Sequence, residues 1–254
     1  MDYNIGAALL LTAGAGLATT IGSVAGMLVR KPGPRFVGFT LGFSAGVMIL
    51  VSFVELLPDS IEKVGFLQAH VAFFIGMTGI FLIDLLVPHD YIGQHDRPGG
   101  SDEDTGLMRT GMLVAFGIAI HNFPEGMATF AGALEDIKVG TAIAVAIAVH
   151  NIPEGLAVSA PIYAATGSRR KAFLWSFLSG VSEPVGAALA ALVLMPILTP
   201  TVLGWVLAGV AGIMVSISVD ELVPAAKASG SEHTPIVGVI AGMAVMALSL
   251  WLLK

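Results

Sequence analysis

Apolar residues along this chain come in long runs, separated by short polar breaks. The first three runs are Leu9–Val29, Phe36–Leu57 and Ala69–Val87, and they contain almost no charged side chains. Each is close to the roughly 20 residues that a helix needs to cross the hydrocarbon core of a bilayer. The pattern continues to the end of the chain and predicts membrane-spanning helices.

Polar residues, glycine and proline punctuate these runs and set the boundaries of the predicted helices. The longest break is acidic, and we predict a loop there over residues 89–107, between the third and fourth spans. We predict an all-α polytopic membrane protein in which residues 1–254 form a single transmembrane domain. The eight predicted spans are residues 6–29, 36–57, 68–87, 108–132, 139–163, 172–195, 202–224 and 235–253.

Composition supports this class and excludes several others. The chain is 56% hydrophobic and 12% charged, with a mean hydropathy of +0.88, whereas soluble domains carry about 25% charged residues. It has no cysteine, which excludes disulfides and thiolate metal sites. The net charge of −6 and the absence of a basic cluster argue against a nucleic-acid partner. Met1–Asn4 lacks the basic start of a cleavable signal peptide, so we expect the first run to be retained.

The distribution of Lys and Arg predicts the orientation. Nine basic residues flank the spans on the side of the first loop, and three flank them on the other side. Because cytoplasmic loops carry the excess of Lys and Arg, we expect the first loop and the 89–107 loop in the cytoplasm and both termini outside. The nine are Arg30, Lys31, Arg35, Arg97, Arg109, Arg169, Arg170, Lys171 and Lys227, and the three are Lys63, Lys138 and Lys254.

Two segments occur twice. His121–Ala128, on the fourth span, matches His150–Ala157, on the fifth, and both copies read His-Asn-x-Pro-Glu-Gly. Ala45–Pro58, on the second span, matches Ala211–Pro224, on the seventh, although chance similarity of small-residue helices is an alternative for this longer pair. The predicted topology makes the copies in each pair run in opposite directions. Inverted repeats of this kind are typical of transporters whose site lies near the membrane midplane.

The repeated motif carries the side chains of a metal site. In each copy the His and the Glu are four residues apart, so they share a helix face, with the Asn beside them. Imidazole and carboxylate suit zinc, ferrous iron and related metals, and amide oxygens also accept harder ions. Glu183, next to Pro184, adds a third carboxylate inside the apolar spans, where no Lys or Arg offsets it. The candidate metal ligands are His121, Asn122, Glu125, His150, Asn151, Glu154 and Glu183.

Pro124 and Pro153 lie inside the motif, where a proline removes one backbone hydrogen bond and bends a helix. We therefore predict a kink beside the ligands in both helices.

Several polar residues also have a plainer interpretation. A membrane His or Asn often hydrogen-bonds between helices, and Glu183 could be a structural acid. Met48, Ser52 and Glu55 form a stripe that could face the same path, but packing of Met48 and a water-facing helix end at Glu55 are alternatives. The remaining candidates could collect metal or simply form a solvated acidic loop, and they are His89, Asp90, His95, Asp96, Asp102, Glu103 and Asp104.

The chain resembles the Zrt/Irt-like (ZIP) metal transporters over essentially its whole length. The resemblance is strongest to the bacterial zinc-transporter branch of that family. The resemblance covers the two His-Asn-x-Pro-Glu-Gly motifs, Ala45–Met48, Ser182–Pro184 and Val219–Pro224. It implies a secondary transporter without cofactors, arranged as three, two and three helices, that takes up divalent cations. Zinc is the foremost cargo, with iron, manganese, cobalt and cadmium as further cargo.

The resemblance also implies a binuclear midplane site on the fourth, fifth and sixth spans. One metal would be held by His121, Glu125, His150 and Glu154, and the other by Asn122, Glu125, Asn151, Glu154 and Glu183. Glu125 and Glu154 would then bridge the two metals. Some relatives carry an acid at the position of Asn151, so the amide here lowers the negative charge of the site. We further expect the bacterial inner membrane, with metal cations and lipid as partners and a homodimer as the candidate assembly.

Two other functions compete with transport of metal. A membrane di-metal enzyme would also use Glu and His, but di-iron helical bundles use Glu-x-x-His, and prolines and inverted repeats serve no purpose in a fixed redox centre. A proton-coupled carrier of organic solutes could use the same residues as a relay. We therefore expect a transporter and not an enzyme.

Overall fold

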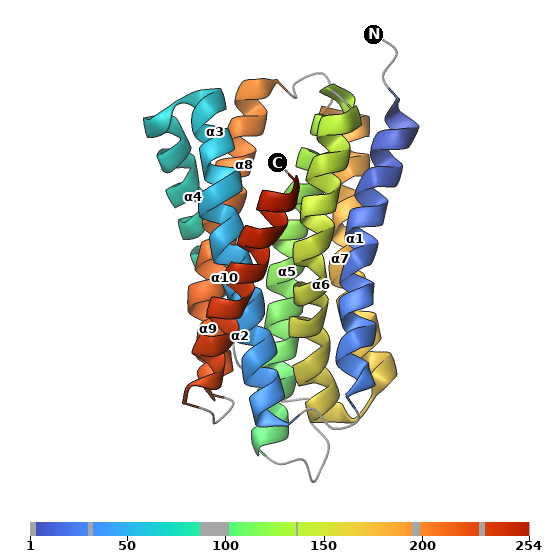
Figure 1. Cartoon of the computed structure of the whole chain (residues 1–254), viewed down its shortest axis with the longest axis vertical. Helices are drawn as coiled ribbons and strands as arrows, with labels where there is room; N and C mark the ends of the chain where they lie inside the picture. Colours follow the sequence, from blue (N-terminus) through green and yellow to red (C-terminus); the bar gives the residue numbers. More distant parts are fainter. Residues whose placement is uncertain are drawn as a thin grey trace.

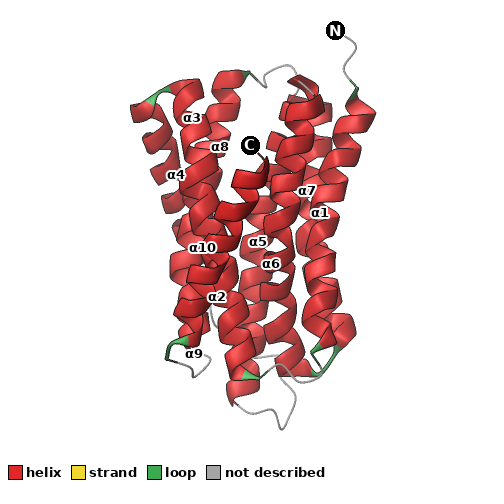
Figure 2. Ribbon diagram, viewed as in Figure 1, coloured by secondary structure: helices red, strands yellow, loops and turns green. Residues whose placement is uncertain are grey.

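In the computed structural model, the parts of the chain that are described are residues 4–29, 33–86, 102–135, 137–194, 199–228 and 232–253. These residues are helical apart from short connections (Figure 2). The helices are α1 (Ile5–Leu28), α2 (Pro34–Val51), α3 (Leu57–Val64), α4 (Phe66–Leu86), α5 (Asp102–Glu135), α6 (Ile137–Thr166), α7 (Arg169–Leu189), α8 (Pro200–Ile217), α9 (Val223–Ala228) and α10 (Thr234–Leu253). Three π-helical turns, η1 (Ser52–Leu56), η2 (Ala190–Leu194) and η3 (Ser218–Leu222), continue α2, α7 and α8.

Within the described residues, seven helical stretches are long and apolar enough to cross a membrane. The all-helical, multi-pass class is therefore confirmed. The fourth predicted span lies in α5, which is not among the seven. α5 begins at Asp102, so residues 102–107 of the predicted 89–107 loop are helical. The other loop residues, with His89, Asp90, His95 and Asp96, lie outside the described part.

The helices form two groups that meet along α5 and α6. α1, α5, α6 and α7 pack against one another, and α2 packs against α10 as α4 packs against α8 (Figure 1). α2 contacts α6, and α8 contacts α5, which joins the groups. In Figure 1, α2 runs upward to α3, whereas α8 runs downward to α9. The largest apolar cluster includes Met48, Ile118 and Met214 and fills the space between the two groups.

Two long helices, α2 continued by α3 and α8 continued by α9, each contain a π-helical turn (Figure 1). The two turns, η1 and η3, occupy matching positions of the Ala45–Pro58 and Ala211–Pro224 segments. Ser52 Oγ donates to the carbonyl of Met48, and Ser218 Oγ donates to that of Met214, both at 2.7 Å. The predicted spans ended at residues 57 and 224, but the helices run on to Val64 and Ala228. Pro58 and Pro224 follow these π-helical turns and lie in the first turn of α3 and α9, respectively. A proline at the start of an α-helix costs little, because its missing N–H would have no partner within the helix.

Prolines inside the site helices do not interrupt them. α5 is helical through Pro124, and α6 is helical through Pro153 and Pro161. The polar residues of the repeated motif therefore stand on unbroken helices, and the kinks proposed from the sequence stay a prediction.

Candidate metal centre

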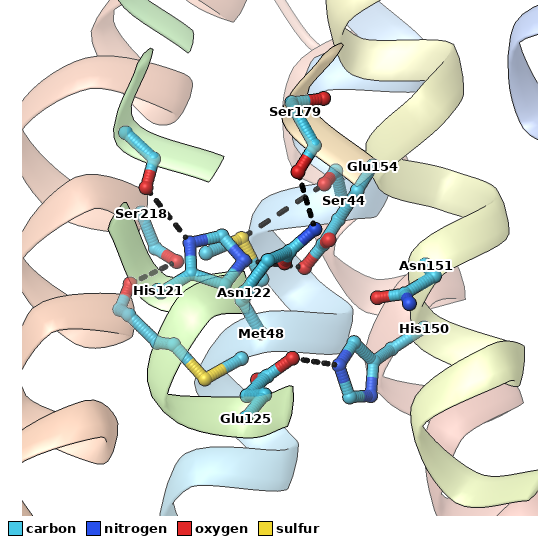
Figure 3. Close-up of polar contacts among 12 residues, drawn as sticks. Ser44, Met48, His121, Asn122, Glu125, His150, Asn151, Glu154, Ser179 and Ser218 are labelled. Carbon is cyan, nitrogen blue, oxygen red and sulfur yellow. Dashed lines mark hydrogen bonds and ion pairs between the residues drawn. The ribbon is translucent and has the colours of Figure 1, made fainter. Parts of the chain in front are cut away.

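The seven predicted ligands are buried within the group formed by α1, α5, α6 and α7, and all except Glu183 are labelled in Figure 3. Three come from α5, three from α6 and one from α7, and each side chain is at most 2% exposed. Burial of so many polar groups inside an apolar helix bundle is costly unless partners or an ion satisfy them. The arrangement of their hydrogen bonds therefore indicates what the site can hold.

Histidine and glutamate pair across the two helices. His121 Nε2 lies 3.0 Å from Glu154 Oε1, and His150 Nε2 lies 3.1 Å from Glu125 Oε2 (Figure 3). The residue earlier on α5 meets the residue later on α6, which is the register of two antiparallel helices. The i, i+4 spacing had put each His beside the Glu of its own helix, but the contacts are made between the motifs. The two copies thus form one crossed set of ligands.

The two asparagines are oriented by backbone carbonyls of flanking helices. Asn122 Nδ2 donates to the carbonyl of Ser179 on α7 at 3.3 Å, and Asn151 Nδ2 donates to that of Ala15 on α1 at 2.9 Å. Asn151 Nδ2 also donates to Glu183 Oε2 at 2.8 Å, which ties the α7 carboxylate to the motif. Because the amide nitrogens face the carbonyls, the amide oxygens point the other way.

Five buried oxygen atoms of this cluster have no hydrogen-bond donor among the described residues. They are Asn122 Oδ1, Glu125 Oε1, Asn151 Oδ1, Glu154 Oε2 and Glu183 Oε1. Carboxylate and amide oxygens only accept hydrogen bonds, so such a group needs donors or a cation. In the described part, no Lys or Arg forms an ion pair with these three carboxylates.

The ligands are grouped in pairs and do not form a closed cage. Within the described residues, no three His, Asp or Glu side chains converge on one point suited to a metal ion. Each histidine Nε2 instead faces a carboxylate of the other motif. His121 is further oriented by its Nδ1, 3.1 Å from the carbonyl of Gly117, as second-shell contacts orient histidine ligands in metal sites. A cation would bind here by replacing the His–Glu contacts with bonds to itself.

The remaining candidates differ in their positions. Met48 is fully buried in the apolar cluster, and its sulfur lies 4.0 Å from Ser44 Oγ (Figure 3). The Ser52 hydroxyl donates its hydrogen bond to the Met48 carbonyl. Glu55 is half-buried in η1, which contacts α2, α3 and α8. The hydrogen-bonded cluster is therefore built from the matched pair of motifs together with Glu183.

The sequence analysis did not identify the two glycines that allow the flanking helices to pack closely beside the candidate ligands. A Cβ atom on Gly126 would collide with the carbonyl of Glu183, and one on Gly155 would collide with that of Thr19. The last residue of each motif thus lets a flanking helix come into backbone contact, as small residues do in membrane helix pairs. The sequence did contain an indication of this close packing, because both copies of the motif end in glycine.

Known zinc transporters are similar to this chain over nearly its whole length. The family described as ZIP Zinc transporter matches residues 87–250. A protein named Zinc transporter ZupT from Chlorobium luteolum is 53% identical, over 98% of this chain and 99% of the relative. Proteins of the same name from Nitratidesulfovibrio vulgaris and Streptococcus mutans are 51% and 48% identical, and each alignment covers 99% of this chain and at least 98% of the relative.

Proposed function

The chain belongs to the ZIP zinc transporter family, whose members are transporters and not enzymes, and on that premise we propose that it carries zinc across a membrane through the crossed His–Glu site. It is a multi-pass membrane protein with a metal cation as substrate. The finer features proposed here are uptake into the cell, the bacterial inner membrane, eight spans with both termini outside, and inverted repeats. A homodimer stays a prediction.

The observation that carries this proposal is the set of five buried oxygen acceptors without donors, beside two imidazoles. An anion would leave these oxygens unsatisfied and would be repelled by the carboxylates. A divalent cation offsets the charge of the carboxylates and satisfies several oxygens at once. Imidazole nitrogen with carboxylate oxygen is a donor set that suits zinc, iron, cobalt and cadmium, and the two amide oxygens also accept harder ions such as manganese.

Zinc would enter the site by exchanging its water for protein ligands. The Nε2 atom of His121 would leave Glu154 and face the cation, and the Nε2 of His150 would leave Glu125 in the same way. The carboxylates are already within 3.1 Å of the rings, so small side-chain rotations suffice. Return of the His–Glu contacts would then compensate for the loss of the cation when it leaves toward the other side.

Release on the opposite side requires the two helix groups to change their relative position. We propose a rocking movement along the α2–α6 and α5–α8 contacts, which join the groups. The matched π-helical turns, the opposite directions of α2 and α8, and the antiparallel α5–α6 register support an inverted-repeat architecture.

Zinc flux into proteoliposomes tests the proposal. Purified protein should accumulate radiolabelled zinc, and Glu154→Ala should abolish accumulation while the variant still inserts. Glu55→Ala is the matched control, because Glu55 is a half-buried acid outside the site, and it should retain flux. Uptake by Glu154→Ala at the wild-type rate would refute the assignment of the site.

A further inference from the structure

Helix α1 carries none of the proposed ligands, yet it packs on α6 as α7 packs on α5. A Cβ on Gly22 of α1 would collide with the carbonyl of Ile152, and one on Gly186 of α7 would collide with that of Phe123. Ile152 and Phe123 are the variable residues of the two motifs. Helix α1 therefore makes with the second motif the same backbone contact that α7 makes with the first motif.

The correspondence extends through the motif glycines. Gly155 approaches the carbonyl of Thr19 on α1, and its equivalent Gly126 approaches the carbonyl of Glu183 on α7. Since Gly155 and Gly126 are the same motif position, Thr19 occupies on α1 the position that Glu183 occupies on α7. The sequence around the two residues, Leu17–Ile21 against Val181–Val185, shows no evident similarity, so only the contacts reveal the relation.

The asparagine contacts give the same alignment. Ala15 and Ser179, each four residues before Thr19 and Glu183, supply the carbonyls that hold Asn151 and Asn122. At the next residues, Gly16 and Gly180, the backbones of α1 and α7 come into close contact. A Cβ on either glycine would lie 2.7 Å from the carbonyl oxygen of the other. A Cβ on Gly16 would lie 3.0 Å from Glu183 Oε2, and one on Gly180 would lie 3.2 Å from Thr19 Oγ1.

The hydroxyl of Thr19 has no hydrogen-bond partner among the described residues, although the side chain is completely buried. Thr12, equally buried on the same helix, donates its hydroxyl to the carbonyl of Ala8 at 3.0 Å, as threonines in helices commonly do. A buried hydroxyl without a partner is costly, and an ordered water or an ion is the usual explanation. Thr19 therefore differs from Thr12. Other buried hydroxyls, those of Ser23, Thr129 and Ser159, also lack a partner among the described residues, but Thr19 is the one at the position equivalent to Glu183.

We propose that Thr19 is the neutral counterpart of Glu183, and that its hydroxyl holds a water molecule of the partly hydrated cation on the Asn122 side of the site. The shorter side chain leaves to water the space that the carboxylate fills on the Asn151 side. The site is then asymmetric, with a charged Asn151–Glu183 half and an uncharged Asn122–Thr19 half. This inference rests on the proposed function, because it assigns a further residue to the same cation site.

The substitution Thr19→Val keeps the shape of the side chain and removes the hydroxyl. If the hydroxyl holds a cation-bound water, zinc binding measured by calorimetry on the purified protein should weaken about fivefold, the effect of losing one neutral hydrogen bond. Thr12→Val, the matched control, should bind zinc like the wild type, because its hydroxyl bonds only to the helix backbone. Thr19→Ser keeps the hydroxyl and should also retain wild-type affinity.

The possible results separate this inference from the function on which it rests. Wild-type protein that does not bind zinc contradicts the proposed function itself. Wild-type binding with unchanged affinity in Thr19→Val leaves the function intact and overturns the role of Thr19. If Thr19→Val does not fold, Thr19→Ser decides, because a loss of affinity in a folded Thr19→Ser variant would mean that the position matters through packing and not through its hydroxyl.

Discussion

The two asparagines occupy equivalent motif positions, but the structure predicts that they contribute unequally to stability. Asn151 Nδ2 donates two hydrogen bonds, at 2.9 Å to the carbonyl of Ala15 and at 2.8 Å to Glu183 Oε2. Asn122 Nδ2 donates one, to the carbonyl of Ser179, and at 3.3 Å it is longer than a typical bond. Leucine has the same branched arrangement of side-chain heavy atoms as asparagine and cannot donate a hydrogen bond.

The expected magnitudes follow from the partners left behind. In Asn151→Leu, a buried carbonyl and a buried carboxylate oxygen each lose a donor at about 1–3 kcal/mol, so the free energy of unfolding should fall by about 2–6 kcal/mol. In Asn122→Leu, one weak bond is lost, and the decrease should be about 1 kcal/mol. The two leucines remove equal amounts of polar surface, so the comparison isolates the hydrogen bonds.

Thermal unfolding of both variants in the same detergent, with a chelator present to remove bound metal, measures the difference. Asn151→Leu should unfold several degrees below Asn122→Leu, and both should unfold below the wild type. Equal midpoints, or a larger loss for Asn122→Leu, would refute the reasoning that the hydrogen bonds of Asn151 hold α1, α6 and α7 together.

Three further predictions concern the packing and the charges. Gly126→Ala and Gly155→Ala should each lower the free energy of unfolding by at least about 1–3 kcal/mol through overpacking, whereas Gly79→Ala, which meets no atom within 4 Å, should be neutral or slightly stabilising in the same thermal assay. Ser52→Ala and Ser218→Ala should each cost about 1 kcal/mol by removing one hydrogen bond to a buried Met carbonyl, and unequal losses in denaturant unfolding would contradict the matching of the two π-helical turns. Zinc at about 100 times its dissociation constant should stabilise the wild type by about 2.7 kcal/mol, and Glu125→Gln should remove most of this shift; an unchanged shift would exclude Glu125 as a ligand.

Much of the fold follows from the sequence because hydropathy reports directly on the bilayer. The apolar runs located the helices to within a few residues at most boundaries. The predicted ends at residues 57 and 224 were wrong, because the helices continue to Val64 and Ala228. A π-helical turn just before each proline allows the helix to continue, and no simple pattern in the sequence predicts such a turn.

The candidate site was predicted as a list of residues but not as a set of contacts. The repeated motif supplied six of the seven ligands, and the mid-span acid at Glu183 supplied the last. Helical periodicity describes neighbours on one helix, so it could not predict the exchange of partners between His121 and Glu154 or between His150 and Glu125. The relation of Thr19 to Glu183 was also invisible, because it depends on backbone contacts and not on residue identity.

The central claim is that the crossed His–Glu pairs of α5 and α6 bind the transported cation. A crystal of the protein soaked in zinc, with diffraction data collected at the zinc absorption edge, tests it most directly. The account predicts anomalous density between α5 and α6, within bonding distance of His121, Glu125, His150 and Glu154. Ordered zinc elsewhere in the helix bundle, with none at this position, would contradict it.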